Sequence, residues 1–238
     1  SNTFSKLTVF TYENIAKMTA ESSVNLEDIG FGEKPIAVFL SIPDYDRSNH
    51  FIASVFIRQL YFVLAKKATE SMSGKCTREV IFLLDEFGNI PAIESMANII
   101  TVCLGRNIRF NLIIQSYSQL DQLYGDDSQT IIGNCGNKIY IKTDDLGTAR
   151  DFSELLGNRT AINANRSGKV LSMEKTLTEM YEERALLTVN ELMRLRQGEC
   201  VVKRSMKQSD LHGTPITAYP IFNTGKTAFK YRFEYLTD

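Results

Sequence analysis

The chain has 238 residues, of which 43% are hydrophobic and 23% are charged, and these values are ordinary for a globular protein with a real core. The formal net charge is −1, so any contact with nucleic acid must rely on a local basic patch rather than on an overall basic field. No apolar run approaches the roughly 18 residues that a membrane-spanning helix needs, so none is expected in this stretch. The size fits one large domain, or one domain with an appendage.

The cysteines and histidines give no sign of a metal site. The four cysteines lie far apart without CxxC spacing, which favours reduced, structural thiols of a cytosolic protein over zinc ligands or a disulfide framework. Neither His50 nor His212 has a cysteine or carboxylate at ligand spacing, so we expect a surface or capping role for both. The chain begins with Ser1 rather than an initiator methionine, and we interpret it as a piece of a longer protein.

The first predicted elements are a connector, a strand and a long helix. Residues 1–34 are mostly polar and are predicted to lead into the domain. The apolar run Ile36–Leu40 predicts a buried strand, which Pro43 would stop. Residues 50–69 repeat apolar side chains at helical spacing, which predicts a long helix with a broad buried face.

The most informative run is Val80–Glu86, in which five apolar residues end abruptly in two adjacent carboxylates. Continuous apolar runs are typical of strands buried on both faces of a parallel sheet, whose carboxyl ends bind ligands. Asp85 and Glu86 therefore have the form of a Walker B motif. Asp85 would bind Mg²⁺, usually through a coordinated water, and Glu86 would act as general base toward the attacking water. A strand that merely ends in two acidic residues is the alternative.

Helices and strands continue to alternate after the acidic pair. A helix is predicted over residues 93–104, and further strands are predicted over 107–114 and 138–142. The alternation over residues 35–156 predicts a doubly wound α/β domain with a mostly parallel sheet flanked by helices.

Gln115 directly follows the strand predicted over residues 107–114, so it is expected at the same sheet edge as Asp85 and Glu86. In RecA-like motors, a glutamine at this place contacts the γ-phosphate and the catalytic water; a hydrogen bond within a turn is the alternative. Arg106 and Arg109 could each act as an arginine finger on a neighbouring subunit. For Arg106 the alternative of a solvated residue near a helix end stays open, and for Arg109 that alternative is favoured.

No phosphate-binding loop accompanies the acidic pair. Gly225-Lys226-Thr227 has the end of a Walker A motif, but Pro220 stands where the leading glycine is required. Gly74-Lys75-Cys76 lacks both the hydroxyl residue and the leading glycine. We therefore expect the Walker A half of the domain to be missing from these 238 residues, and we expect them neither to bind ATP tightly nor to hydrolyse it by themselves.

The character of the sequence changes at Gly157. Residues 159–171 are polar with alternating small apolar residues, which fits a hairpin or a mobile loop, and residues 229–235 alternate like a late edge strand. Thr188-Val189-Asn190-Glu191 is a capping-box pattern that predicts a short helix. We interpret residues 157–238 as a β-hairpin and edge-strand extension packed on the same domain.

Three stretches carry a resemblance to a known family. They are VIFLLDEFGNIP over residues 80–91, GRN over 105–107 and IIQSYSQLDQLYG over 113–125. Together with KPIAVFLSIPDYDRSNHFIASVFIRQLY upstream and LLTVNELMRL downstream, they resemble the TraG/TraD family of type IV secretion coupling proteins. The resemblance covers nearly the whole chain, and DEFGNIP with QSYSQL is more specific than a generic Walker B motif.

The resemblance implies a RecA-like ATPase of the P-loop NTPase type, a homo-hexamer that brings relaxase-bound single-stranded DNA and relaxosome proteins to the conjugative channel. It implies that Asp85 and Glu86 are the Walker B pair, that Gln115 is the sensor and that Arg106 is the finger. Mg-ATP would be the cofactor of the full-length protein, with Asp85 holding Mg²⁺ through water and Gln115 contacting the nucleotide.

The same resemblance implies an arrangement of the longer protein. Transmembrane helices, the Walker A loop and an all-α domain would precede Ser1, and the parent protein would lie at the cytoplasmic face of the bacterial membrane. The fragment itself is expected to be soluble, cytoplasmic and inactive. Its expected parts are a connector over 1–34, the Walker B half of the nucleotide-binding domain over 35–156, and an extension over 157–238.

Two alternatives stay open. One is another RecA-core translocase, either a secretion-channel ATPase or an FtsK/HerA-like DNA pump. The other is a non-catalytic module whose sheet presents residues 157–235 to relaxosome or substrate proteins.

Overall fold

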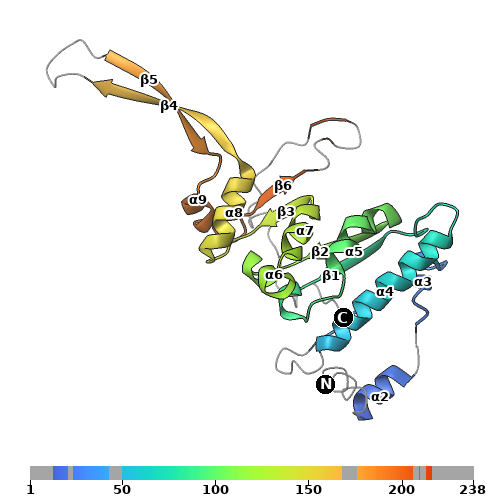
Figure 1. The fold of residues 1–238 in the computed structure, drawn as a ribbon. Helices are drawn as coiled ribbons and strands as arrows, with labels where there is room; N and C mark the ends of the chain where they lie inside the picture. The colour runs from blue at the N-terminus through green and yellow to red at the C-terminus, as the bar shows by residue number, and fades with distance from the viewer. Residues whose placement is uncertain are drawn as a thin grey trace, which may run out of the picture. The chain divides into compact units, whose positions relative to one another are not determined.

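The computed structural model of the chain describes residues 13–20, 24–42, 50–167, 176–205, 209 and 213–215. The chain divides into two compact units, residues 1–135 and residues 136–238 (Figure 1). Each unit has its own buried core. The division at residue 157 that the sequence suggests stays a prediction.

The first unit contains the long helix α4 (His50–Glu70), which confirms the helix predicted over residues 50–69. Two shorter helices, α2 (Glu13–Ala20) and α3 (Asp28–Phe31), precede it. Side chains buried along α4 recur every three or four residues, as one face of a helix requires: Ala53, Ile57, Leu60, Tyr61, Leu64 and Ala68. The long helix therefore contributes one apolar stripe to the core.

The sheet of the first unit is a parallel pair of strands, β1 (Val80–Leu84) and β2 (Ile108–Leu112). In this pair Val80 lies opposite Ile108, and Leu84 lies opposite Leu112. The crossover between the strands consists of the 3-10 turn η3 (Phe87–Asn89), the helix α5 (Met96–Val102) and the 3-10 turn η4 (Cys103–Arg106). Figure 1 shows β1 and β2 side by side, with α4 and α5 next to them. The predicted strand–helix–strand unit is thus confirmed.

One face of the β1–β2 pair is packed and the other is exposed. Val80, Phe82 and Ile108 are buried in one core with side chains of α4 and α5. The alternate residues of β1, Ile81 and Leu83, are 59% and 68% exposed. The prediction that this apolar strand is buried on both faces is therefore wrong.

The strand predicted over Ile36–Leu40 is not formed. Its residues have no regular secondary structure, and Phe39 is 93% exposed. The backbone just before this segment is held by Arg78, whose Nη1 donates to the carbonyl oxygen of Lys34 over 2.9 Å. An apolar run forms a strand only where a neighbouring strand offers backbone partners, and no described strand pairs with these residues.

Two further helices complete the first unit. They are α6 (Tyr117–Tyr124) and α7 (Asp127–Asn134), which follow β2. Leu120 and Ile131 bury one side chain from each helix in the same core as β1 and β2. The ring of Phe87 stacks on that of Tyr124 with centroids 5.7 Å apart, which fastens the turn after β1 to α6.

The second unit is built on an antiparallel pair, β3 (Asn137–Tyr140) and β6 (Val201–Arg204). Its helices are α8 (Leu146–Leu156) and α9 (Val189–Met193). The buried side chains of this small core come from β3, α8 and α9: Tyr140, Ala149, Phe152 and Leu192. The capping box predicted at the start of α9 is confirmed, since Thr188 and Glu191 exchange both hydrogen bonds.

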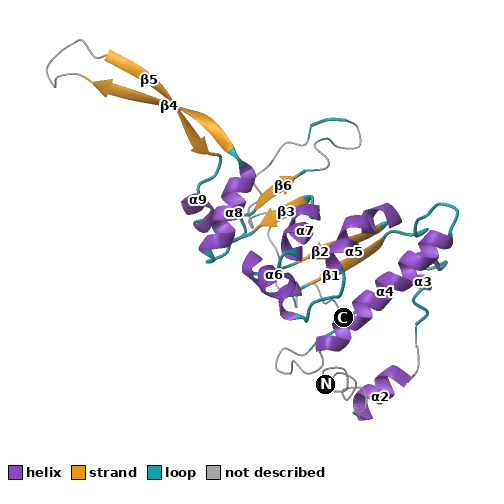
Figure 2. Ribbon diagram, in the orientation of Figure 1, coloured by secondary structure: helices purple, strands orange, loops and turns teal. Residues whose placement is uncertain are grey.

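A long hairpin extends the second unit. Strands β4 (Asn158–Ser167) and β5 (Thr176–Ala185) pair antiparallel over their whole length, with Asn158 opposite Ala185 (Figure 2). A hairpin was one of two predictions for residues 159–171, and these residues do enter one, but its second strand lies beyond that range at Thr176–Ala185. The edge strand predicted over residues 229–235, and His212, lie outside the described residues.

Only one of the three described strand pairs is parallel. No helix in the described part of the chain combines the length and apolar character that crossing a bilayer demands.

Candidate functional site

The residues that follow β1 and β2 are joined by backbone hydrogen bonds, and the acidic pair lies among them. The N–H of Ile113 donates to the carbonyl oxygen of Leu84 over 3.0 Å, and the N–H of Phe87 then donates to the carbonyl oxygen of Ile113 over 2.9 Å. Asp85 and Glu86 occupy the two positions between these bonds, and both side chains are exposed. The carboxylates therefore lie at the carboxyl edge of the parallel pair, as the sequence predicts.

Glu86 has a left-handed backbone, with φ 51° and ψ 39°. This conformation is uncommon for a residue with a side chain, and non-glycine residues in it cost on the order of 1 kcal/mol or more. The turn η3 begins immediately after Glu86 and carries Asn89 at its end. The left-handed residue thus redirects the chain from the strand into the 3-10 turn.

The carboxylate of Glu86 receives hydrogen bonds from two side-chain amides. Gln115 donates from Nε2 to Oε2 over 3.1 Å and to Oε1 over 3.3 Å. Asn89 donates from Nδ2 to Oε2 over 2.7 Å. The structure thus brings Glu86 and Gln115 together at one edge of the sheet, as the sequence predicts. Asn89 has no signal in the sequence that reveals this contact.

Asp85 contributes a single carboxylate to this edge. Its Oδ1 accepts the N–H of Glu86 over 3.1 Å. Among the described residues, no group of three or more histidine, cysteine, aspartate or glutamate side chains could hold a metal ion. Mg²⁺ is commonly held by one or two carboxylates together with waters and substrate phosphates. One exposed carboxylate at the strand end fits that mode, and it does not fit a closed, all-protein metal site.

The Gln119 side chain contacts the residue that follows β2 and lies close to Gly88 in the turn after β1. The side-chain carbonyl oxygen of Gln119 accepts the backbone N–H of Gln115 over 3.0 Å. A Cβ atom on Gly88 would lie 2.5 Å from the same oxygen, so only glycine allows η3 to approach α6 this closely. A cavity of about 410 Å³ lies beside this contact, lined by His50, Gly88, Asn89, Ile90, Pro91, Gln119, Gln122 and Leu123.

His50 is a buried residue beside this loop, at the first position of α4, so of the surface or capping role predicted for it the surface position is wrong. Its side chain is only 6% exposed, and Nδ1 lies 3.4 Å from the carbonyl oxygen of Asn89. Four residues along α4, Ser54 donates to the carbonyl oxygen of Pro91 over 2.6 Å. The first turns of α4 therefore contact the backbone carbonyl groups of Asn89 and Pro91, at the end of η3 and just after it.

Tyr124 supports the same loop from α6. Its hydroxyl accepts the N–H of Ile93 over 3.1 Å. Burial raises the pKa of the Tyr124 hydroxyl to about 12, and the hydrogen bond from Ile93 opposes part of that rise. Tyr124 thus stays neutral and keeps the segment after η3 in place.

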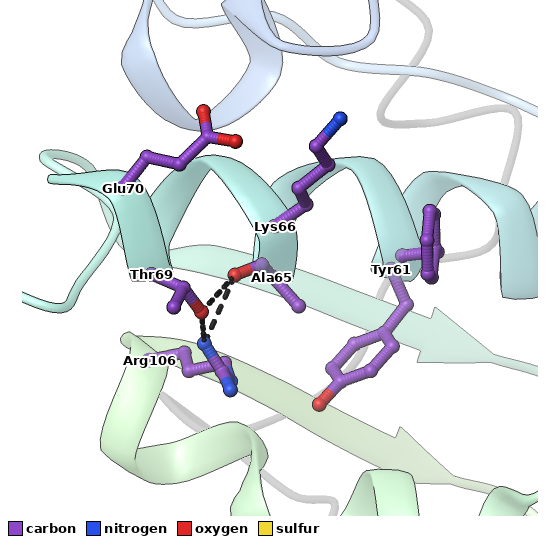
Figure 3. Close-up of a pocket in the computed structure, with 7 residues that line it drawn as sticks. Tyr61, Ala65, Lys66, Thr69, Glu70 and Arg106 are labelled. Atoms are coloured by element: carbon purple, nitrogen blue, oxygen red, sulfur yellow. Dashed lines mark hydrogen bonds between the residues drawn. The ribbon is translucent and has the colours of Figure 1, made fainter.

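Arg106 lies at the opposite end of the strands from the acidic pair. The N–H groups of Cys76 and Val80, just before and at the start of β1, bond to the carbonyl oxygens of Arg106 and Asn107 over 3.0 Å each. Arg106 Nη1 donates to the carbonyl oxygen of Ala65 over 2.9 Å and to the hydroxyl of Thr69 (Figure 3). The structure therefore does not bring Arg106 to Asp85, Glu86 and Gln115 within one chain.

A shallow pocket of about 340 Å³ surrounds the Arg106 side chain, lined by Tyr61, Phe62, Ala65, Lys66, Thr69, Glu70 and Arg106 (Figure 3). Burial raises the pKa of the Tyr61 hydroxyl, and the Arg106 guanidinium counteracts this. Arg109 instead pairs with the carboxylate of Glu79, and both side chains are partly exposed. This agrees with the favoured interpretation of Arg109 as a solvated basic residue.

A family model described as "TraM recognition site of TraD and TraG" matches residues 79–197, half of the chain. The chain belongs to the TraG/TraD family. The matched residues begin just before β1 and include Asp85, Glu86, Asn89 and Gln115.

Relatives of this TraG/TraD chain include proteins named VirD4. VirD4 of Agrobacterium fabrum is 31% identical over 60% of the chain and 21% of the relative, and VirD4 of Rhizobium radiobacter is 29% identical over 76% and 26%. An uncharacterised protein of Bacillus anthracis is 32% identical over 53% of the chain and 47% of the relative. The chain thus spans less than half the length of these relatives.

Solved structures show the fold of this TraG/TraD chain. The conjugative coupling protein TrwB in an unbound form matches with a TM-score of 0.52 at 18% identity, over 65% of the chain and 34% of TrwB. A TrwB complex with the non-hydrolysable ATP analogue ADPNP matches with a TM-score of 0.50, also at 18% identity, over 66% and 35%. This likeness confirms the predicted RecA-like α/β fold.

Proposed function

We propose that the chain is part of an ATP-driven motor that couples relaxosome-bound single-stranded DNA and protein to a type IV secretion channel in conjugation. The observation that carries the proposal is the hydrogen bonding of Gln115 to Glu86, at the adjoining ends of two parallel strands, in a chain of the TraG/TraD family. Relatives named VirD4 and the conjugal transfer protein TraG of Escherichia coli support it. Family membership favours this motor over an FtsK/HerA-like pump.

The acidic residues and Gln115 would divide the chemistry. Asp85 would hold Mg²⁺ through water, and a metal bound there neutralises phosphate charge as it develops. Glu86 would accept the proton of the attacking water as general base. Gln115 would sense the state of the Glu86 carboxylate, and the hydrogen bond from its amide to that carboxylate supports this role.

Nucleotide binding would require a phosphate-binding loop that these 238 residues do not carry. The solved complex of TrwB with ADPNP supports Mg-ATP as the ligand of the complete motor. We therefore propose that the chain by itself binds ATP weakly and is inactive. A phosphate-binding loop contributed by other residues would complete the site around Asp85.

Arg106 would act as a finger only in a homo-hexamer, where it would reach the nucleotide of a neighbouring subunit. Its position at the edge opposite Asp85 is compatible with that role. The hydrogen bonds to Ala65 and Thr69 would have to open first. While these bonds are intact, Arg106 braces the end of α4.

The second unit and its hairpin would contact partner proteins. The family model that matches residues 79–197 is described as a TraM recognition site, and this range contains α8, β4, β5 and α9. We propose that this region binds relaxosome proteins at the cytoplasmic face of the cell membrane. Binding and hydrolysis would then occupy separate units of one chain.

The proposed function is tested by changing Glu86 to glutamine at the natural gene and measuring conjugative DNA transfer. Glu86→Gln keeps the size of the side chain but removes the carboxylate base, so we expect transfer to fall by about two orders of magnitude or more. Asn98→Gln, an exposed position on α5, is the matched control and should transfer normally. Normal transfer by Glu86→Gln would refute the motor role of this site.

Nucleotide titration of the 238-residue chain is the complementary measurement. We expect no saturable binding of a fluorescent ATP analogue in the micromolar range. Tight binding, or hydrolysis that Glu86→Gln abolishes, would show that the chain contains a complete site.

A further inference from the structure

Asn89 approaches the Glu86 carboxylate more closely than Gln115 does. Its Nδ2 lies 2.7 Å from Oε2, whereas the nearest approach of Gln115 Nε2 is 3.1 Å. Side chains three residues apart eclipse one another in a 3-10 turn. Glu86 is the N-cap of η3, and Asn89 is the last residue of η3, three positions later. The short contact is therefore a direct consequence of the turn geometry.

The position of Asn89 is itself held from two directions. Its backbone N–H donates to the carbonyl oxygen of Glu86 over 2.8 Å, which closes the turn. Its own carbonyl oxygen lies 3.4 Å from Nδ1 of the buried His50 at the start of α4. The backbone of Asn89 is thus held at both its N–H and its carbonyl group, while the residue and the carboxylate that its side chain contacts are exposed.

An exposed glutamate loses side-chain entropy when it is confined to one rotamer. Hydrogen bonds to a charged group are stronger than those between neutral groups, so two amide donors from different elements can offset that cost. Gln115 approaches from the end of β2 and Asn89 from η3. Removing either donor leaves the carboxylate attached at one side only.

We propose that Asn89 is a positioning residue that fixes the Glu86 carboxylate against Gln115 at the sheet edge. The proposal rests on the proposed function of Glu86 as base. It adds a residue whose role is to hold the base in the orientation that the reaction needs, without itself contacting the reacting atoms. Misplacing a catalytic group by about 1 Å can lower a rate by about a hundredfold, so this support has a large effect on turnover.

The contact itself is tested by NMR on the ¹⁵N-labelled 238-residue chain, with no nucleotide present. The side-chain NH₂ signals of Asn89 and Gln115 are assigned from their loss in Asn89→Asp and Gln115→Glu. We expect Glu86→Ala to shift both pairs of signals and to speed the exchange of the Asn89 protons to the rate of the exposed Asn98. Unchanged Asn89 signals in Glu86→Ala would overturn the proposal.

The role is tested by conjugative transfer in cells that carry variants at the natural gene. Asn89→Asp is isosteric but removes the donor and adds a charge beside Glu86, so we expect transfer to fall at least about tenfold. Asn89→Gln keeps an amide donor on a longer side chain and should recover part of that loss. Asn98→Asp is the matched control.

The two levels of proposal fail in different ways. If Glu86→Gln transfers normally, the motor role of the site is refuted whatever Asn89 does. If Glu86→Gln abolishes transfer while Asn89→Asp and Asn89→Ala both transfer normally, the positioning role is refuted and the motor role stands. Equal losses in Asn89→Asp and Asn89→Gln, with correspondingly lowered thermal stability, would show that Asn89 only supports the fold of the turn.

Discussion

Arg106 donates from Nη1 to the carbonyl oxygen of Ala65, 41 residues earlier, over 2.9 Å. This carbonyl group lies in the second-last turn of α4, and the same nitrogen also contacts Thr69. A guanidinium at a helix C-terminus satisfies carbonyl oxygens and complements the helix dipole. One arginine thus joins the end of α4 to the start of β2.

Arg106→Ala is expected to lower the free energy of unfolding by about 1–2 kcal/mol, because it leaves the Ala65 carbonyl group without this donor. Urea unfolding of the purified chain measures the change. Arg109→Ala removes only an exposed ion pair with Glu79 and should cost less than about 0.5 kcal/mol. Equal effects of the two variants would contradict the bracing role. A fall in transfer for Arg106→Lys at unchanged stability would instead favour the finger.

Gly88→Ala is expected to destabilise the chain by about 1–3 kcal/mol, because the added methyl group would lie 2.5 Å from the Gln119 side-chain oxygen. Adding Gln119→Ala removes the contacts with the Gln119 side-chain oxygen and Cδ but leaves the one with its Cβ at 2.9 Å, so it should relieve part of the clash and make the double variant more stable than the sum of the single effects predicts. Gly105→Ala is the control, since nothing lies within 4 Å of its added carbon. Additive effects at Gly88 and Gln119 would show that the two do not meet.

Glu86→Gly is expected to change the free energy of unfolding by less than about 1 kcal/mol, because glycine adopts φ 51° without the steric cost that glutamate bears but loses the hydrogen bonds from Asn89 and Gln115 and is more flexible when unfolded. The same variant removes the proposed base, so conjugative transfer should be lost. Ser95→Gly is the matched control, since Ser95 also has a left-handed backbone, with φ 61°, at the start of α5. It should gain stability and keep transfer. A Glu86→Gly chain destabilised beyond that limit would mean that the side-chain hydrogen bonds of Glu86 outweigh the strain.

Stability is expected to fall as the pH rises from about 10 toward 12. The pKa of Tyr124 is raised by burial to about 12, whereas an unfolded tyrosine titrates near pH 10. The folded chain therefore retains a proton that the unfolded chain releases, and stability present below pH 10 is lost through this window. Urea unfolding at a series of pH values measures the slope, and Tyr124→Phe should reduce it. An unchanged slope in Tyr124→Phe would exclude Tyr124 as a source.

The sequence predicts the strand–helix–strand frame of the site correctly because a continuous apolar run favours a strand and apolar side chains at helical spacing favour a helix. It places Asp85, Glu86 and Gln115 at one edge, because parallel strands joined by one crossover end at the same side. It misses Asn89 and Gln119, since a contact within a 3-10 turn or between η3 and α6 depends on backbone angles that no apolar pattern encodes. The left-handed conformation of Glu86 is likewise invisible in the sequence.

Two wrong predictions about the fold have a common cause. The run Ile36–Leu40 and the strand β1 both contain enough apolar residues to be buried on two faces, but Phe39, Ile81 and Leu83 are exposed. Composition indicates how much apolar surface a segment can bury, and it does not tell whether a covering neighbour belongs to the same 238 residues. In the hairpin the sequence fails in the opposite direction. The charged residues of β5, such as Glu182 and Glu183, give no apolar pattern that predicts a strand, yet these residues form one by backbone pairing with β4.

The exposed face of β1 also offers a practical means of handling the chain. Ile81 and Leu83 make little contribution to the core, so replacing them by threonine and lysine should leave folding nearly unchanged while making the surface less adhesive. Such a chain should remain dispersed at the high concentrations that spectroscopy and crystallisation require. The same two substitutions would also test for a partner surface on this strand. If they leave the folding of the 238-residue chain unchanged but impair function in the cell, another polypeptide surface covers this face of β1.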